Sequence, residues 1–240
     1  MENKRSIIYI PGEELPNFSE VKSGNVATGV LYRSSSPLKG GDHKKTKGIL
    51  AIKAGIKCVI NLDDDSSVIE NLSGDVPWYH KLLVDGNVIC LPMTLVIPGV
   101  TSNEKKMRTA LRFMIAHEGP YLIHCFAGVD RTGFFVALLE ALMGANLEEI
   151  LRGYMSAFSP DYSDSYSVED YRKTENFLKQ LKMMAHGKNI AAVNLQSVAK
   201  QYLLNDIRLS QDEIMKLENI LGRANPPITN CSISTLSGIS

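Results

Sequence analysis

Short apolar runs bounded by turn residues mark the first two thirds of the chain and predict strands. The clearest is residues 57–62 (KCVINL), which is rich in β-branched side chains and lies between Gly55 and three consecutive aspartates. A second is residues 121–124 (YLIH), a short apolar run that ends at a cysteine. Both are expected to be buried strands of a sheet. Weaker strand candidates are residues 30–33, 78–84 and 87–93.

Apolar residues at helical spacing separate these runs and fill the last third of the chain. Such a pattern runs from Asn103 to Gly119, and residues 131–143 repeat it. Ser210 is followed three residues later by Glu213, which is the capping box of a helix start. The helices predicted in this way are 42–54, 103–118, 131–143, 147–157, 168–184, 195–205 and 210–221.

Strands that alternate with helices predict an α/β fold, in which a central, mostly parallel sheet is flanked by helices. No strand is predicted after about residue 146, so the C-terminal third adds a helical layer to the same domain. No linker-like stretch separates the two parts. We therefore expect one domain over residues 1–224, followed by a disordered tail over residues 225–240.

The 240 residues carry 26 Lys+Arg and 26 Asp+Glu, so the formal charge is zero. A neutral chain has no global field that favours nucleic acid or an anionic membrane, and neither is expected as a partner. No apolar run is long enough to span a bilayer, and the one near the N-terminus is too short for a signal peptide. A cytoplasmic location is therefore expected, and the oligomeric state is not predicted.

Neither a zinc site nor a disulfide scaffold is expected, and no metal or cofactor is predicted. The reason is that the four cysteines lack CxxC spacing and do not cluster: Cys58, Cys90, Cys125 and Cys231. Residues 43–47 (HKKTK) are the one local basic cluster. We favour a solvated helix face for it, with a patch that steers an anionic substrate as the alternative.

Residues 124–133, which read HCFAGVDRTG, combine a cysteine and an arginine six positions apart between a strand and a helix. The intervening amides can curl into an anion nest at the positive end of the helix, which also stabilises a thiolate. A guanidinium matches two oxygens of a phosphate. Cys125 is the predicted nucleophile. The predicted phosphate-binding residues are Phe126, Ala127, Gly128, Val129, Asp130 and Arg131.

Phosphoryl transfer needs a proton for the leaving oxygen, and two places in the sequence offer an acid. Asp130 immediately precedes Arg131. Asp63, Asp64 and Asp65 follow the strand at residues 57–62, whose end can open on the same edge of the sheet. For these three the alternative is a solvated turn, which we favour.

Three further residues are predicted to support the site. Thr132 can donate its hydroxyl to the cysteine sulfur and help it to leave in a second step. His124 is expected to orient the loop by hydrogen bonding rather than to act as a base. For Arg33, a second anion contact at the mouth of the site and a structural salt bridge are equally open.

The sequence HCFAGVDRTG resembles the H-C-x5-R-[ST] signature of the cysteine-dependent protein tyrosine phosphatase superfamily. Its second half is similar to the bacterial tyrosine/serine phosphatase family and to myotubularin lipid phosphatases. Residues 29–35 (GVLYRSS) and 55–62 (GIKCVINL) resemble two further segments of that bacterial family. Strong similarity is confined to residues 124–133, and weak similarity covers most of the chain.

The resemblance implies a tyrosine-phosphatase-like fold in which Cys125 is the nucleophile, Arg131 the phosphate clamp and Thr132 the partner of the thiolate. In myotubularin-like loops the aspartate before the arginine serves as acid, which favours Asp130. The separate Trp-Pro-Asp acid loop of ordinary tyrosine phosphatases is missing. Lipid-active bacterial relatives often carry lysine where this chain has Val129, which favours phosphotyrosine over a phosphoinositide.

The expected function is metal-independent hydrolysis of phosphomonoesters through a cysteinyl-phosphate intermediate. Phosphotyrosine proteins are the favoured substrate, with phosphoserine and phosphothreonine as further ones, so the expected partner is a phosphorylated protein or a small phosphoester. Two alternatives stay open. One is a phosphatase of phosphoinositides or other small phosphoesters, and the other is a pseudophosphatase that binds phosphate without hydrolysing it.

Overall fold

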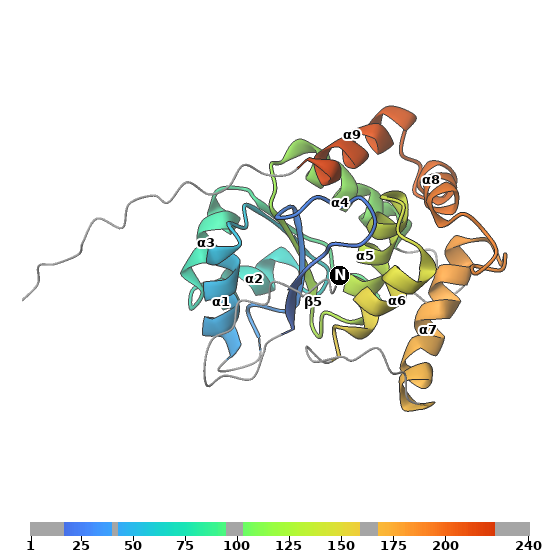
Figure 1. The fold of residues 1–240 in the computed structure, drawn as a ribbon. Helices are drawn as coiled ribbons and strands as arrows, with labels where there is room; N and C mark the ends of the chain where they lie inside the picture. Colours follow the sequence, from blue (N-terminus) through green and yellow to red (C-terminus); the bar gives the residue numbers. More distant parts are fainter. Residues whose placement is uncertain (1–16, 40–42, 95–102, 159–167, 224–240) are drawn as a thin grey trace, which may run out of the picture.

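The computed structural model describes residues 17–39, 43–94, 103–158 and 168–223 (Figure 1). Five strands form one sheet in the order β1-β2-β5-β3-β4. The β1–β2 pair is antiparallel and the other neighbours are parallel, so the predicted central, mostly parallel sheet is confirmed. The strands are β1 (Phe18–Glu20), β2 (Leu31–Ser35), β3 (Cys58–Asn61), β4 (Val88–Cys90) and β5 (Tyr121–Cys125).

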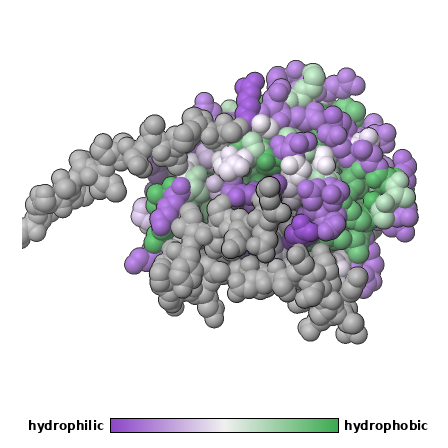
Figure 2. All heavy atoms as spheres, in the orientation of Figure 1, coloured by the Kyte–Doolittle hydropathy of each residue, from purple (hydrophilic) through white to green (hydrophobic). Residues whose placement is uncertain are grey.

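Helices flank the sheet on both sides in Figure 1, as predicted. One layer contains α1 (His43–Lys53), α2 (Ser66–Ser73) and α3 (Pro77–Val84). The other contains α4 (Glu104–Ala116), α5 (Asp130–Leu142), α6 (Leu147–Met155), α7 (Val168–Met184), α8 (Leu195–Asn205) and α9 (Gln211–Gly222). Hydrophilic residues predominate over the described part of the face drawn in Figure 2, with hydrophobic residues in smaller groups.

Successive residues of the central strands belong to different hydrophobic cores, because side chains alternate across a sheet. On β5, Leu122 packs with the α1–α3 layer and Ile123 with the α4–α9 layer. On β3, Val59 and Ile60 divide in the same way. Burial on both faces explains why these strands read as continuous apolar runs.

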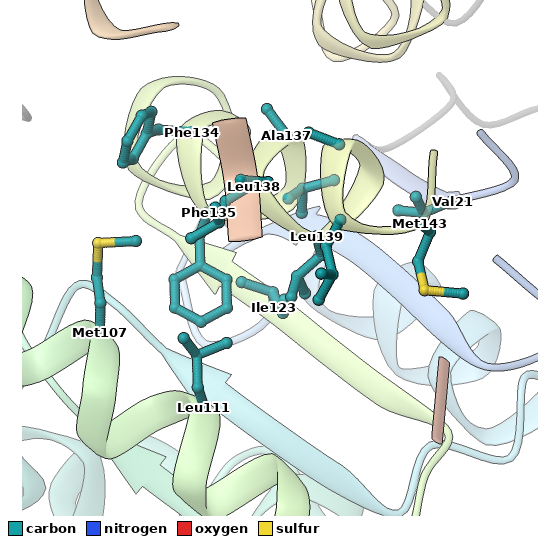
Figure 3. Packing of buried hydrophobic residues seen from close by; sticks show 14 of the residues in the cluster. Val21, Met107, Leu111, Ile123, Phe134, Phe135, Ala137, Leu138, Leu139 and Met143 are labelled. Carbon is teal, nitrogen blue, oxygen red and sulfur yellow. The ribbon is translucent and has the colours of Figure 1, made fainter. Parts of the chain in front are cut away.

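Helix α5, which follows the cysteine motif, is buried from Thr132 to Leu142. In Figure 3 the Phe135 ring lies between α5 and Leu111 of α4, close to Ile123 of the sheet. A mainly apolar helix that is buried on all sides belongs in the centre of a domain. The element that begins at the motif is therefore fixed by packing on every side.

The strand expected at residues 78–84 is wrong, because this segment is helix α3. Pro77 occupies the first turn, where its fixed φ suits a helix and its missing N–H costs nothing. Tyr79 is buried, and Leu82 and Leu83 pack against the same core. This i, i+3, i+4 spacing is helical, and in so short a run it is easily mistaken for a strand.

Two elements were not predicted. Helix α2 begins at Ser66, where the Asp65 side chain accepts a hydrogen bond from the Val68 amide as its N-cap. Strand β1 is a three-residue edge strand without an apolar run of its own. The other predicted strands and helices correspond to elements of the structure. The tail at residues 225–240 and Asp42, the first residue of the helix predicted over 42–54, lie outside the described residues.

Candidate active site

The candidate site lies at the edge of the sheet where four parallel strands end. The register pairs Cys125, the last residue of β5, with Ser35, the last residue of β2. On the other side of β5, His124 pairs with Asn61 at the end of β3. The loop from Cys125 to Arg131, here named the phosphate loop, is therefore flanked by the residues that follow β2 and β3.

Three carbonyl groups of the phosphate loop accept hydrogen bonds from donors outside the loop. In a planar trans peptide, the C=O and the following N–H point in opposite directions. Each of these bonds thus turns the next amide, at residues 127–129, toward the inside of the loop. The bonds are Ser36 N to Phe126 O (3.0 Å), Asn17 Nδ2 to Ala127 O (2.8 Å) and Arg33 Nη2 to Gly128 O (2.7 Å).

The sulfur of Cys125 lies inside this turn. The Gly128 amide donates to Cys125 Sγ at 3.3 Å, in agreement with its inward direction. Cys125 is buried, and helix α5 begins five residues later at Asp130. Inward amides and the positive end of a helix both stabilise negative charge, whether on a thiolate or on a phosphate.

Gly128 cannot be replaced without moving the loop. Its φ of +73° lies in the left-handed region that favours glycine. A Cβ at this position would lie 2.4 Å from the carbonyl oxygen of Ser34. The phosphate loop therefore lies directly against the end of β2, and a side chain here would push the two apart.

Arg33 lies beneath the phosphate loop, where it is only 2% exposed. Besides the bond to Gly128, its Nη1 donates to the Gly153 oxygen at 3.1 Å. The side chain thus joins β2, the phosphate loop and helix α6. These contacts give Arg33 a structural role, but the acceptors are carbonyl oxygens and not the carboxylate of the expected salt bridge.

Replacement of Arg33 by methionine is expected to lower the free energy of unfolding by about 2–4 kcal/mol, because two charge-assisted hydrogen bonds are lost and their acceptors stay buried. Urea titration measures this change. Arg112→Met is the matched control, since its exposed ion pair with Glu213 is worth less than about 1 kcal/mol. Equal stability of the two variants would contradict the supporting role of Arg33.

The guanidinium of Arg131 is held from the β3 side of the site. Its Nη1 donates to the carbonyl oxygens of Leu62 (3.0 Å) and Met93 (3.4 Å), and Nη2 forms an ion pair with Asp63 Oδ1 at 2.9 Å. Both terminal nitrogens are thus anchored by residues that follow β3 and β4. Among the described residues these contacts do not use the Nε–H or the second N–H of Nη2, so two donors of the guanidinium stay available to an anion in the loop.

The solvated turn that we favoured for Asp63 and Asp64 is wrong. Lys39 Nζ binds Asp63 at 2.7 Å and Asp64 at 2.6 Å, and these carboxylates are only 11% and 10% exposed. Burial opposes ionisation of Asp63, but the hydrogen bonds from Lys39 and Arg131 prevail and lower its pKa below the ordinary value. Asp65 caps α2 instead. The aspartates are drawn inward because two cations face them.

Asp130 occupies the first turn of α5 and is half-buried. The Tyr154 hydroxyl donates to its Oδ1 at 3.4 Å, and no ion pair to Asp130 forms among the described residues. The predicted bond from Thr132 to the sulfur is not formed in this structure. Thr132 Oγ1 is buried without a hydrogen-bond partner in the described part of the chain, and the sulfur accepts from Gly128.

His124 is buried under the α3 side of the loop. One of its ring nitrogens, Nε2, lies 3.0 Å from the Tyr79 hydroxyl. Asn61 joins the same cluster, since its Nδ2 donates to Tyr79 at 3.4 Å and its Oδ1 accepts from the Asp63 amide. Burial lowers the pKa of His124 to about 3, so the ring is neutral. This geometry suits orientation of the loop by hydrogen bonding.

The solvated face favoured for residues 43–47 is wrong for Lys47, which is 3% exposed. Its Nζ donates to Ser35 Oγ, to the Ser36 oxygen and to the Lys39 oxygen. Burial, with a smaller contribution from Lys44, lowers the pKa of Lys47 to about 8. Lys47 thus holds the segment after β2 that supplies the Ser36 amide to the phosphate loop.

Several side chains of the site were missed in the sequence. Asn17 stands 110 positions before the carbonyl that it binds, and Lys39 is 24 positions before Asp63. Neither residue belongs to a motif, so nothing local identified them. Tyr154 likewise belongs to no motif of the sequence.

A model of the tyrosine phosphatase family matches residues 14–222, which include all five strands and all nine helices of the described residues. The chain belongs to the tyrosine phosphatase family. Membership supports a phosphoric monoester hydrolase, the class expected from the cysteine motif. None of the described helices has the length and apolar character needed to cross a membrane.

The individual proteins to which the chain is similar share low sequence identity with it. A protein of Nostoc commune named tyrosine-protein phosphatase is 28% identical over 127 residues, which cover 47% of this chain and 42% of that protein. TpbA of P. aeruginosa is 20% identical, with a TM-score of 0.45, over 77% of this chain and 91% of its own. The catalytic domain of the PP-IP phosphatase SIW14 from S. cerevisiae is 20% identical, with a TM-score of 0.40, over 75% of this chain and 98% of its own.

Proposed function

We propose that the chain hydrolyses phosphomonoesters through a cysteinyl-phosphate intermediate on Cys125. The observation that carries the proposal is the position of Cys125 Sγ inside a turn of inward amides, one of which donates to the sulfur. Oxygens of a phosphate that bind these amides bring the phosphorus against the sulfur. The nucleophile and the groups that stabilise the developing charge thus come from one segment.

In the first step the Cys125 thiolate attacks phosphorus, the S–P bond forms and the P–O bond to the leaving group breaks. The leaving oxygen takes a proton from Asp130. In the second step a water oxygen attacks phosphorus, the S–P bond breaks and the electron pair returns to sulfur. Asp130, now a carboxylate, takes the proton from that water, and inorganic phosphate is released. Only groups of the chain and water take part.

Asp130 is preferred to Asp63 as the acid because their surroundings differ. Asp63 binds Lys39 and Arg131, which lower its pKa and keep it ionised, so it has no proton to donate at neutral pH. Asp130 has a neutral hydroxyl as its neighbour. Asp63 is instead suited to hold the Arg131 guanidinium in place for the phosphate.

Phosphotyrosine is the preferred substrate class because of Phe126. This side chain follows the nucleophile directly and is 61% exposed, although it is large and apolar. Lys39 Nζ lies 5.5 Å from the centre of the ring and supports it by a cation–π contact. An exposed aromatic wall beside the sulfur favours a substrate with an aromatic ring.

A cytoplasmic location remains a prediction from composition.

The wild-type chain in EDTA is expected to hydrolyse a phosphotyrosine peptide with a higher kcat/KM than the matching phosphoserine peptide or a phosphoinositide. Phe126→Ala is expected to lower kcat/KM for phosphotyrosine about 10-fold, as the loss of one aromatic contact implies, and to change the phosphoserine value less. Release of inorganic phosphate measures each of these rates. Met215→Ala, which removes another large exposed apolar side chain on α9, away from the phosphate loop, is the control.

Three results would overturn the proposal. Activity that EDTA abolishes would contradict a reaction that uses only the chain and water. Phosphoinositides hydrolysed faster than the peptides would indicate the lipid or small phosphoester class instead. Tight binding of the phosphotyrosine peptide without any release of phosphate would indicate a pseudophosphatase.

A further inference from the structure

We propose that Tyr154 of helix α6 is a positioning residue for proton transfer, which holds the Asp130 carboxyl in the orientation that serves the leaving oxygen. The inference rests on the proposed function, since it gives the acid of that reaction a partner. It also gives the helical C-terminal third a part in the chemistry.

The contact joins a buried hydroxyl to a more exposed carboxyl. Tyr154 Oη donates to Asp130 Oδ1 at 3.4 Å. Tyr154 is 2% exposed, whereas Asp130 is half-buried at the surface of the site. Because Oδ1 accepts this bond, the other carboxyl oxygen, Oδ2, is the one that carries the proton to the substrate. Without this bond, the Asp130 side chain at the start of the helix could adopt several rotamers.

The Tyr154 ring is locked by two aromatic neighbours. Phe177 of α7 stacks on it, with ring centroids 3.9 Å apart and an interplanar angle of 4°. Phe158 meets it edge to face at 5.5 Å. Two side-chain torsions place the oxygen of a tyrosine hydroxyl, so a ring packed on a face and an edge fixes the position of that oxygen. The bond to Asp130 is therefore supported from α7.

Gly133 leaves room for this ring at the start of α5. A Cβ on Gly133 would lie 2.7 Å from Cδ2 of Tyr154. A glycine in a helix interior costs about 1 kcal/mol relative to alanine, so its presence here calls for a reason. The structure supplies one, because the Tyr154 ring passes over this glycine on its way to Asp130.

The hydroxyl also remains a donor throughout the reaction. Burial, and then the charge of Asp130, raise the pKa of Tyr154 above its ordinary value. Tyr154 therefore does not compete with Asp130 as an acid. Its hydrogen bond persists when Asp130 becomes a carboxylate after the first step, and it holds the same oxygen for the return of the proton in the second.

Tyr154→Phe is the direct test, because it keeps the stacked ring and removes only the hydroxyl. On phenyl phosphate, whose phenolate is a poor leaving group, the expected loss in kcat/KM, which reports the first step alone, is about 10-fold, the value of one hydrogen bond to a charged group. On p-nitrophenyl phosphate, whose leaving group needs little help from an acid, the expected loss is less than about 3-fold. KM is expected to stay the same for both substrates.

Tyr202→Phe is the matched control. Tyr202 is a buried tyrosine of α8 that packs edge to face on Phe134, and it makes no hydrogen bond to the phosphate loop among the described residues. This variant is expected to change the rate of hydrolysis of neither substrate. Gly133→Ala is a second test of the same contact, since its Cβ displaces the Tyr154 ring, and it is expected to reproduce the selective loss on phenyl phosphate.

Asp130→Asn separates this inference from the proposed function. In the Asp130→Asn background, Tyr154→Phe is expected to cause no further loss on phenyl phosphate, because there is no acid left to position. Equal losses on both substrates, or losses that add to that of Asp130→Asn, would overturn the role of Tyr154 alone. If Asp130→Asn itself leaves the rate on phenyl phosphate unchanged, the acid proposed for the reaction is wrong as well.

Discussion

Replacement of Cys125 by serine is expected to abolish turnover and to leave the binding of phosphate esters intact. A serine hydroxyl in place of the thiolate removes the nucleophile, and the expected loss in kcat is at least about 10⁴-fold, as for other covalent nucleophiles. The amides of residues 127–129 keep their direction, because Ser36, Asn17 and Arg33 hold the carbonyls and not the sulfur.

Two measurements check this expectation. Steady-state hydrolysis of p-nitrophenyl phosphate gives the loss in kcat, and calorimetric titration with a phosphotyrosine peptide gives the affinity. Cys90→Ser is the matched control, since burial raises the pKa of the Cys90 thiol to about 11 and makes it a poor nucleophile. Activity that survives Cys125→Ser, or is lost in Cys90→Ser, would place the nucleophile elsewhere.

Arg131→Lys is expected to lower kcat/KM by about 10³-fold although it keeps the positive charge, because the planar fork that binds two phosphate oxygens is lost. A single ammonium also cannot reproduce the three anchoring contacts to Leu62, Met93 and Asp63. Affinity for inorganic phosphate is expected to fall in parallel, since the guanidinium binds the ground state as well as the transition state.

Asp63→Asn serves as the graded comparison for Arg131→Lys. It removes the ion pair but leaves the guanidinium bound to the carbonyl oxygens of Leu62 and Met93, so the expected loss is only about 10-fold. Rates on p-nitrophenyl phosphate and phenyl phosphate separate this role from that of an acid. A loss confined to phenyl phosphate would make Asp63 the acid and would contradict the assignment of Asp130.

The sheet was predictable because local pattern and global position agree in its central strands. Val59 and Ile60 belong to cores on opposite faces of the sheet, and so do Leu122 and Ile123. Both faces of these strands are therefore apolar, and a continuous apolar run was a reliable signal of a strand. The prediction for helix α3 was wrong because its pattern is ambiguous. In eight residues with Tyr79 buried, the apolar positions fit the helical period and the strand period equally well. The helical third followed from its periodicity, and α9 does begin with the predicted capping box.

The core of the candidate site was predictable because nucleophile, amides and arginine come from one segment. What the sequence did not contain is the support that reaches this segment from elsewhere. Arg33 lies on β2 and Asn17 directly precedes β1, so their contacts with the loop depend on the register of β1 with β2 and of β2 with β5. The inward position of Asp63 depends in the same way on Lys39, whose approach is a tertiary contact without a local pattern.

The proposed mechanism requires the phosphoryl group to pass through the sulfur of Cys125. Rapid quenching of the wild-type chain in denaturant during turnover of a phosphotyrosine peptide, followed by peptide mass spectrometry, tests it most directly. A cysteinyl-phosphate mechanism predicts one phosphoryl group on the peptide that contains Cys125, formed before phosphate is released and absent in Cys125→Ser. A phosphoryl group on any other residue, or a burst of product without a phosphorylated chain, would contradict it.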